Sequence, residues 1–210
     1  MQESFIAIEG IERFADADGN LPENVQMALV RAINRTVDRT RTRAARAVLE
    51  QVAFPASYLS PSNKRLFVSV RAKKASLQAV IEGRDSPTML ARFAKGAKVT
   101  TGNQRPKNNS VSVRVAAGGA YRAIPRAFLI RLKNNNIGLA VRTDGSAPRG
   151  AYKPREIGKN LFLLYGPSVD QALQSARTGN GVYEEISPDA LDFLTNEFHR
   201  QMDVLEGKNG

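Results

Sequence analysis

The sequence predicts an α+β fold in which a long N-terminal helix and a C-terminal helix pack on a mainly antiparallel sheet of about five strands, with extended loops. Three observations predict it: a helical apolar period near the start, alternating apolar residues in the middle, and a capped amphipathic segment near the end. With 210 residues, 42% of them hydrophobic, the chain is long enough for a single domain, residues 1–210, with its own core. The absence of cysteine excludes disulfides and thiolate metal sites.

The first helix is expected from Leu21-Pro22-Glu23 to about Gln51, a stretch without internal Gly or Pro. Its core stripe, at about 100° per residue, is Val25, Leu29, Ile33, Thr36, Val37, Ala44, Ala47 and Val48. A neighbouring stripe carries Arg31, Arg35 and Arg39 and, further along, Arg46. Like charges four residues apart repel by roughly 0.2–0.5 kcal/mol per pair, so the row suggests an external partner. A solvated helix face, a protein interface and direct nucleic-acid contact all stay open.

Strands are expected in the middle of the chain, where the apolar period changes to two. The alternating segments are residues 64–71, 76–82, 110–115, 126–132 and 137–141. Between the last two stands Asn134-Asn135-Asn136, and Asn tolerates a positive φ. This triplet therefore predicts the tip of a hairpin.

Two long loops are expected around these strands. Residues 92–109 contain five basic residues, no acid, two glycines and a proline, and residues 143–159 contain Gly145, Pro148, Gly150 and Pro154. The first loop is either mobile or becomes ordered when the protein assembles. The candidate contacts to a partner or to DNA are the arginine row Arg31, Arg35, Arg39 and Arg46 together with Lys95, Lys98, Arg105 and Lys107 of this loop.

The last helix is expected to begin at Ser187-Pro188-Asp189 and to end near Glu206, before Gly207. Serine is a good N-cap, proline fits the first helical position, and an acid in the first turn complements the helix dipole. The predicted core stripe of this helix is Leu191, Leu194, Phe198, Met202 and Leu205. Seven acids and one Arg occur from Glu184 to Glu206. This acidic helix complements the arginine row, either within one subunit or head to tail between subunits.

The net charge of +11 is concentrated in the middle of the chain. Residues 1–63 carry 7 basic and 8 acidic side chains, residues 64–159 carry 21 and 4, and residues 160–210 carry 3 and 8. A segment with this excess predicts a polyanionic neighbour or an acidic protein surface. Nucleic acid is one candidate, and another copy of the chain, offering its acidic end, is the second.

Motifs of known chemistry are absent from the sequence. It contains no phosphate-binding glycine loop, no nucleophile elbow and no pair of histidines at metal-ligand spacing. Its single histidine is His199, and no sequence motif identifies a nucleophile that this histidine could activate. We therefore expect no catalytic residue, no cofactor and no metal, and a protein that is not an enzyme. The sequence has no run of 18 apolar residues and no signal peptide, which predicts no membrane contact and synthesis in a cytoplasm.

Three stretches, taken in order, resemble the prophage minor tail protein Z family of long, non-contractile tailed phages. They are the helix Ala28–Thr36 with the Arg/Ala-rich segment Arg41–Arg46, then Pro125-Arg126-Ala127-Phe128, then Leu164–Val169 ahead of the final helix. The resemblance covers about residues 22–206, and it departs from the family at Asn160-Leu161-Phe162-Leu163-Leu164, where a Leu-Pro-Ile-type lead is usual.

The resemblance implies a structural virion protein, a minor tail or tail-completion protein near the head–tail joint of the phage, assembled in the host bacterial cytoplasm. It further implies a homo-oligomer, in the form of a six-fold ring, with other tail and neck proteins and the genome DNA end as partners. The alternative function is a basic, sequence-independent nucleic-acid-binding protein. That alternative predicts a DNA affinity that falls steeply with salt, whereas the tail function predicts weak DNA binding and strong association between subunits.

Overall fold

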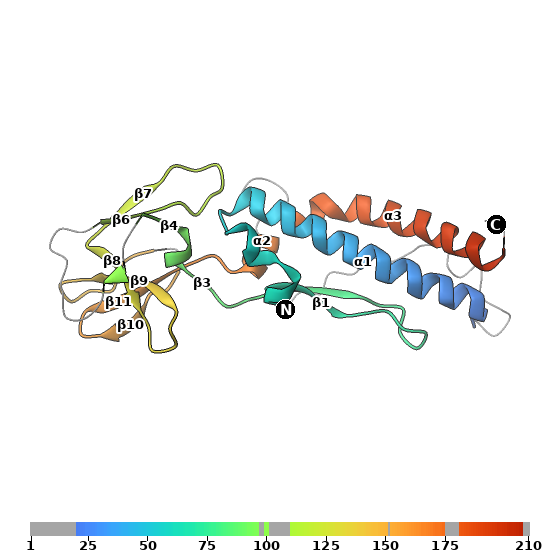
Figure 1. Cartoon of the computed structure of the whole chain (residues 1–210), viewed down its shortest axis with the longest axis horizontal. Helices are drawn as coiled ribbons and strands as arrows, with labels where there is room; N and C mark the ends of the chain where they lie inside the picture. The colour runs from blue at the N-terminus through green and yellow to red at the C-terminus, as the bar shows by residue number, and fades with distance from the viewer. Residues whose placement is uncertain (1–19, 97–98, 101–109, 151, 175–180, 208–210) are drawn as a thin grey trace. The chain divides into compact units, whose positions relative to one another are not determined.

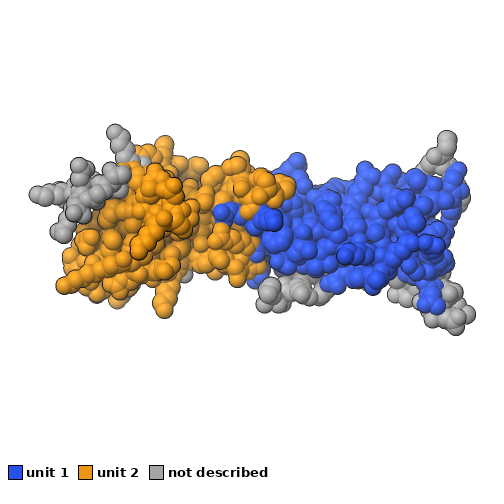
Figure 2. Space-filling view, turned by 60° about the horizontal axis from the view of Figure 1, so that its bottom comes forward, with its two compact units in different colours: residues 1–47, 64–83, 173–210 blue, residues 48–63, 84–172 orange. Residues whose placement is uncertain are grey.

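The computed structural model describes residues 20–96, 99–100, 110–150, 152–174 and 181–207 (Figure 1). It has the α+β fold that the sequence predicts, with a long N-terminal helix, a C-terminal helix and mostly antiparallel strands. The chain divides into two compact units (Figure 2). Unit 1 consists of residues 1–47, 64–83 and 173–210, and unit 2 of residues 48–63 and 84–172. Because the chain returns to unit 1 twice, length and composition give no sign of this division.

The first helix, α1, spans Glu23–Gln51, close to the predicted bounds. Pro22 precedes it and accepts the backbone N–H of Gln26, and the acid at the first position complements the helix dipole. Seven of the eight predicted stripe residues are buried, and the eighth, Ile33, packs against the core of unit 1. The helical period thus identified the buried face of α1 correctly.

The C-terminal helix, α3, spans Val182–Leu205, so the predicted start at Ser187 is wrong. Pro188 lies inside the helix, and the Ser187 hydroxyl donates to the carbonyl oxygen of Tyr183 instead of capping a helix end. An internal proline costs a helix about 3 kcal/mol in general. Burial of Val182 and Ile186, which are 0% and 9% exposed, offsets that cost and holds the additional first turn in place.

The core of unit 1 lies between the two helices, which run side by side (Figure 1). Its buried members are Val25, Ala28, Leu29 and Ala32 of α1 with Leu194 and Phe198 of α3. Met202 and Leu205 pack against this core as predicted, whereas Leu191 is 39% exposed, so its predicted place in the stripe is wrong. The buried residues of this core therefore all come from the two helices, which pack against each other.

An antiparallel hairpin of β1 (Leu66–Val70) and β2 (Val80–Gly83) completes the described part of unit 1. The Asn34 side chain of α1 both donates to and accepts from the backbone of Ala72, with two bonds of 3.0 Å. The buried Arg41 donates from Nε and Nη2 to the carbonyl oxygen of the first residue of β1, at 3.0 and 2.9 Å. These bonds hold the hairpin along α1.

Unit 2 contains a six-stranded sheet and a three-stranded sheet. In the larger sheet the order is β10-β11-β9-β8-β5, with β3 also paired to β11, and every pairing is antiparallel except that of β5 with β8. Its strands are β3 (Thr88–Met89), β5 (Val99–Thr100), β8 (Ala127–Arg131), β9 (Ile137–Arg142), β10 (Arg155–Gly158) and β11 (Leu161–Gly166). The smaller sheet has the order β4-β6-β7, and its strands are β4 (Ala94–Lys95), β6 (Ser110–Val113) and β7 (Arg122–Pro125).

Short helices accompany these sheets: η2 (Ala56–Leu59), η3 (Pro61–Asn63), η4 (Leu90–Phe93) and α2 (Val169–Gln174). Four of the predicted strands lie at β1, β6, β8 and β9, and the fifth overlaps β2. Asn135 has a φ of 66° between β8 and β9, which confirms the predicted hairpin tip.

The two predicted loops are more ordered than expected. In the first, Arg92–Phe93 belongs to η4 and Lys95 to β4, while residues 101–109 lie outside the described part. In the second, residues 155–158 form the edge strand β10, whose residues are all exposed. Backbone pairing with β11 orders this segment although it has no apolar alternation of its own, so periodicity could not reveal it.

Candidate functional site

The arginine row of α1 lies beside α3 of the same chain. Arg35 Nη1 lies 3.4 Å from Glu197 Oε1, and Arg39 Nη2 lies 3.3 Å from the carboxylate of Asp189, which Arg43 also contacts. The Arg39 guanidinium additionally stands 4.3 Å from the centre of the Phe193 ring. Because the apolar stripes of the two helices pack together, the adjacent arginine stripe meets acids of α3. The charge complementarity between row and acidic helix is thus satisfied inside one chain.

Glu197 is the most enclosed acid of this interface, with its side chain only 5% exposed. It accepts bonds from Arg200 at 3.0 and 2.6 Å and from the Gln201 amide at 2.6 Å. Hydrogen bonding from Arg200 is the largest cause that lowers the pKa of Glu197 below its ordinary value, and burial opposes it. This carboxylate therefore stabilises the contact between α1 and α3 in its charged form.

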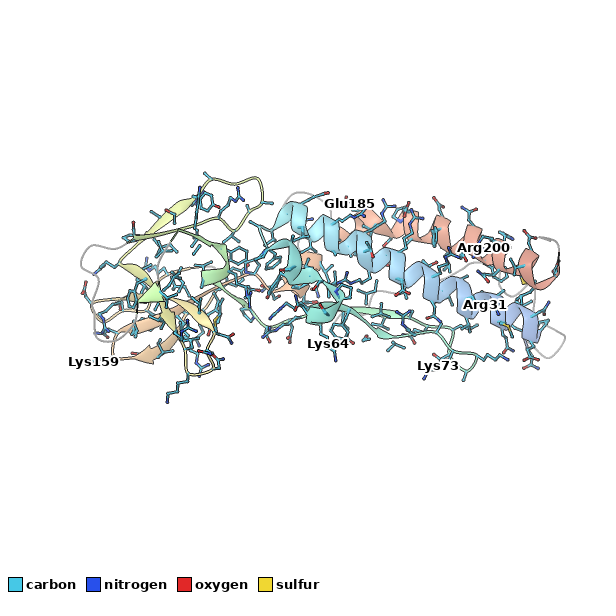
Figure 3. All side chains as sticks on the ribbon, viewed as in Figure 1. Arg31, Lys64, Lys73, Lys159, Glu185 and Arg200 are labelled. Carbon is cyan, nitrogen blue, oxygen red and sulfur yellow. The ribbon has the colours of Figure 1, made fainter. Side chains whose placement is uncertain are left out.

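Arg31 and Arg46, the other two members of the row, are exposed on α1, and Figure 3 labels Arg31. In the described part of the chain neither makes an ion pair. Of the four arginines predicted to contact a partner, these two keep their charged groups available. Lys98, Arg105 and Lys107 lie outside the described residues.

The division into units separates the charge of the molecule. Unit 1 contains 15 basic and 15 acidic residues, whereas unit 2 contains 16 basic and five acidic residues, a net charge of +11. Between Asp85 and Asp144, both of unit 2, the sequence has 11 basic residues and no acid. The whole formal net charge of the chain therefore belongs to unit 2, where few acids are at hand to compensate it.

The sheet β4-β6-β7 of unit 2 carries a basic and aromatic group that we call the Tyr121 cluster, which consists of Lys95, Arg114 and Tyr121. Lys95 Nζ lies 5.1 Å and the Arg114 guanidinium 5.0 Å from the centre of the Tyr121 ring, which are cation–π distances. Tyr121 is 42% exposed, so part of its side chain stays accessible beside the two cations. Among the expected contact residues, only Lys95 belongs to this cluster within the described residues.

Sequence reasoning missed the other two members of the Tyr121 cluster. Arg114 stands at a polar position of the alternating segment 110–115, and Tyr121 follows Gly118-Gly119-Ala120, outside the alternation. One signal was available: an aromatic residue next to Arg122, in a long stretch without acids, is the composition of a polyanion-binding surface.

The remaining features of the described residues concern metal donors and membrane spans. Within them, no three His, Asp or Glu side chains come together as metal donors, and His199 is exposed on α3. None of the helices in the described ranges is both long and apolar enough to cross a bilayer. Comparison of the chain with family models, curated protein sequences and solved structures gives no significant match.

Proposed function

We propose that this chain is a structural virion protein, a minor tail or tail-completion protein that acts by assembly near the head–tail joint of a phage and presents its basic unit 2 to a polyanion. The resemblance over residues 22–206 supports the place in the tail. The separation of charge carries the rest: unit 1 is balanced and has ion pairs of its own, whereas unit 2 has a net charge of +11. A body with such an excess attracts a partner of opposite charge.

Assembly into a homo-oligomer, with a six-fold ring as the expected form, is part of this proposal. The contact between subunits does not use Arg35 and Arg39 against a neighbouring acidic helix, because both pair with α3 of their own chain. Arg31 and Arg46 are the members of the row that a neighbouring tail or neck protein can reach. DNA contacts in this function are to phosphates without base readout, since a passing genome has to slide.

One observation favours a second candidate function, a free nucleic-acid-binding protein. The acid-free stretch from residue 86 to 143 carries 11 basic residues, and such an excess supports phosphate binding by a monomer as readily as within a ring. The two functions differ in stoichiometry and in their dependence on salt.

Mass photometry across a salt series, with and without short duplex DNA, tests the proposal. A discrete oligomer that persists without DNA supports the tail function. A monomer that gains mass only with DNA, and loses it at moderate salt, contradicts assembly and supports the second candidate.

A matched pair of charge variants tests the role of unit 2. Lys133→Gln with Lys159→Gln removes two exposed charges from unit 2, and Lys64→Gln with Lys73→Gln removes two from unit 1. Figure 3 labels Lys64, Lys73 and Lys159. We expect the first pair to weaken DNA binding and to lower its salt dependence, while the second pair leaves both close to wild type. Equal losses in the two variants would contradict a specific role of unit 2.

A further inference from the structure

We propose that the outer face of the sheet β4-β6-β7 binds single-stranded nucleic acid, with an unpaired base stacked on Tyr121 and phosphates bound by Lys95 and Arg114. This inference rests on the polyanion contact of the proposed function and names the surface and the form of nucleic acid.

The register of the sheet places these residues on one face. Ser112 of β6 pairs with Lys95 of β4 and with Ala123 of β7, and residues directly opposite in antiparallel strands point to the same side. The alternation continues past the strand ends to Arg114 and Tyr121, and both Lys95 and Arg114 contact the Tyr121 ring. The cluster and two small residues thus share one side of the sheet.

The opposite side of the same sheet is the buried one. Val111 and Val113 of β6 are 3% and 7% exposed, whereas Ser110, Ala123 and Lys95 on the cluster side are exposed. The side chains of serine and alanine are short, so they do not block access to the exposed ring of Tyr121. A nucleic-acid strand can therefore approach the ring across small side chains.

The two cations of the Tyr121 cluster have no acidic partner in the part of the chain that the structure describes. Neither Lys95 nor Arg114 belongs to an ion pair there, and Arg114 Nε is buried without a hydrogen-bond partner among the same residues. Both groups rest on the Tyr121 ring. An exposed cation–π contact is weaker than a stacked base, so an incoming base can displace one cation, which then binds the adjacent phosphate.

A single strand fits this surface better than the two rival occupants. Duplex DNA keeps its bases stacked inside the helix, so it can use the two cations but gives the ring no partner. The carboxylates of an acidic peptide can likewise bind the two cations, but carboxylates do not stack on an aromatic ring. The exposed aromatic ring with two cations about it, at 5.1 and 5.0 Å from its centre, is the observation that favours unpaired bases.

Fluorescence anisotropy of a labelled 12-nucleotide oligo(dT), with a 12-base-pair duplex as comparison, tests the proposal on the full chain. We expect wild type to bind the single strand more tightly than the duplex, and Tyr121→Ala to weaken single-strand binding about 5- to 150-fold. Tyr121→Phe keeps the ring and should stay within about twofold of wild type. Circular dichroism melting confirms that each variant is folded.

Charge-matched variants separate stacking from general electrostatics. Lys95→Gln and Lys159→Gln each remove one exposed charge of unit 2, but only Lys95 touches the ring. We expect Lys95→Gln to lower the salt dependence of single-strand binding by roughly 0.7 in the log–log slope and Lys159→Gln to change it less. Because the chain has no Trp, the five tyrosines dominate its intrinsic emission, and oligo(dT) should quench a part of it that is missing in Tyr121→Phe.

The possible outcomes distinguish this inference from the function on which it rests. Equal affinity for duplex and single strand, with Tyr121→Ala no weaker than Lys159→Gln, overturns the stacking surface and leaves the polyanion contact of unit 2 standing. Binding of an acidic peptide in preference to oligo(dT) overturns it in favour of a protein partner. A discrete oligomer that binds no nucleic acid also overturns it, while the assembly function stands.

Discussion

Replacement of Glu197 by glutamine tests whether the charged contacts between α1 and α3 stabilise unit 1. The amide has nearly the shape of the carboxylate, so the variant removes the charge and leaves the packing around Phe198 and Leu194 in place. We expect the folded protein to be less stable at pH 7, because the group is only 5% exposed and accepts bonds from Arg200 and Gln201.

The size of the effect follows from which of these bonds are shielded from water. A hydrogen bond to a buried charged group contributes about 1.5–3 kcal/mol, and the variant keeps a neutral acceptor for Gln201. Arg35 and Arg200 are 59% and 46% exposed, so their attraction to Glu197 is largely screened. The free energy of unfolding should therefore fall by about 1–2 kcal/mol, which for a chain of this length lowers Tm by about 2–8 °C.

Urea unfolding followed by circular dichroism from pH 7 to pH 3 gives the assay, with Asp192→Asn, an exposed acid of the same helix, as control. The pKa of Glu197 is lowered in the folded protein, so its contribution is present above the ordinary value of 4.5 and is lost as the pH falls through the folded-state pKa. The difference between wild type and Glu197→Gln should then shrink in acid. A difference that is absent at pH 7, or unchanged at pH 3, would refute the reasoning.

Three further predictions concern single contacts. Arg39→Glu with Arg43→Glu should lower the free energy of unfolding by about 1–2 kcal/mol and leave the mass distribution in mass photometry equal to that of wild type, because both arginines pair within the chain; a shift to lower mass would contradict this. Gly138→Ala should destabilise unit 2 by about 1–3 kcal/mol in thermal melting, because the new methyl group would lie 2.6 Å from Leu163 Cδ2. An unchanged Tm would contradict this close packing. Asn135→Val should cost about 1–2 kcal/mol in the same assay, whereas glycine at that position should be tolerated, because the φ is 66°.

The elements that the sequence predicted well are those in which burial follows a simple period. One face of α1 packs against α3 and the hairpin, and its apolar residues repeat with the helical period. The buried stripe and the bounds of α1 could therefore be predicted from residues 23–51 alone. The hairpin tip at Asn135 was predicted because a local backbone requirement selects the residue. In these cases the sequence signal and the structural cause are local.

The elements that were missed depend on partners distant in the chain. β10 is ordered by pairing with β11, and the additional first turn of α3 is held by burial of Val182 and Ile186, which outweighs the stop signal of Pro188. Among the candidate contact residues, charge alone could not separate Arg35, which pairs with α3, from Arg31, which stays exposed. That distinction requires the angle at which the two helices meet, and no residue pattern encodes it locally.

The discontinuous make-up of unit 1 has a consequence for how the protein is synthesised. The last of the α1 residues in the buried core of unit 1 is Ala32, but their partners Leu194 and Phe198 follow about 160 residues later, which at typical elongation rates takes about 10–30 s. Residues 48–63 and 84–172 emerge in between, so unit 2 can fold on the ribosome while α1 still exposes its apolar face. Nascent chains stalled before residue 182 should therefore bind chaperones through α1, and unit 1 closes only after α3 has been made.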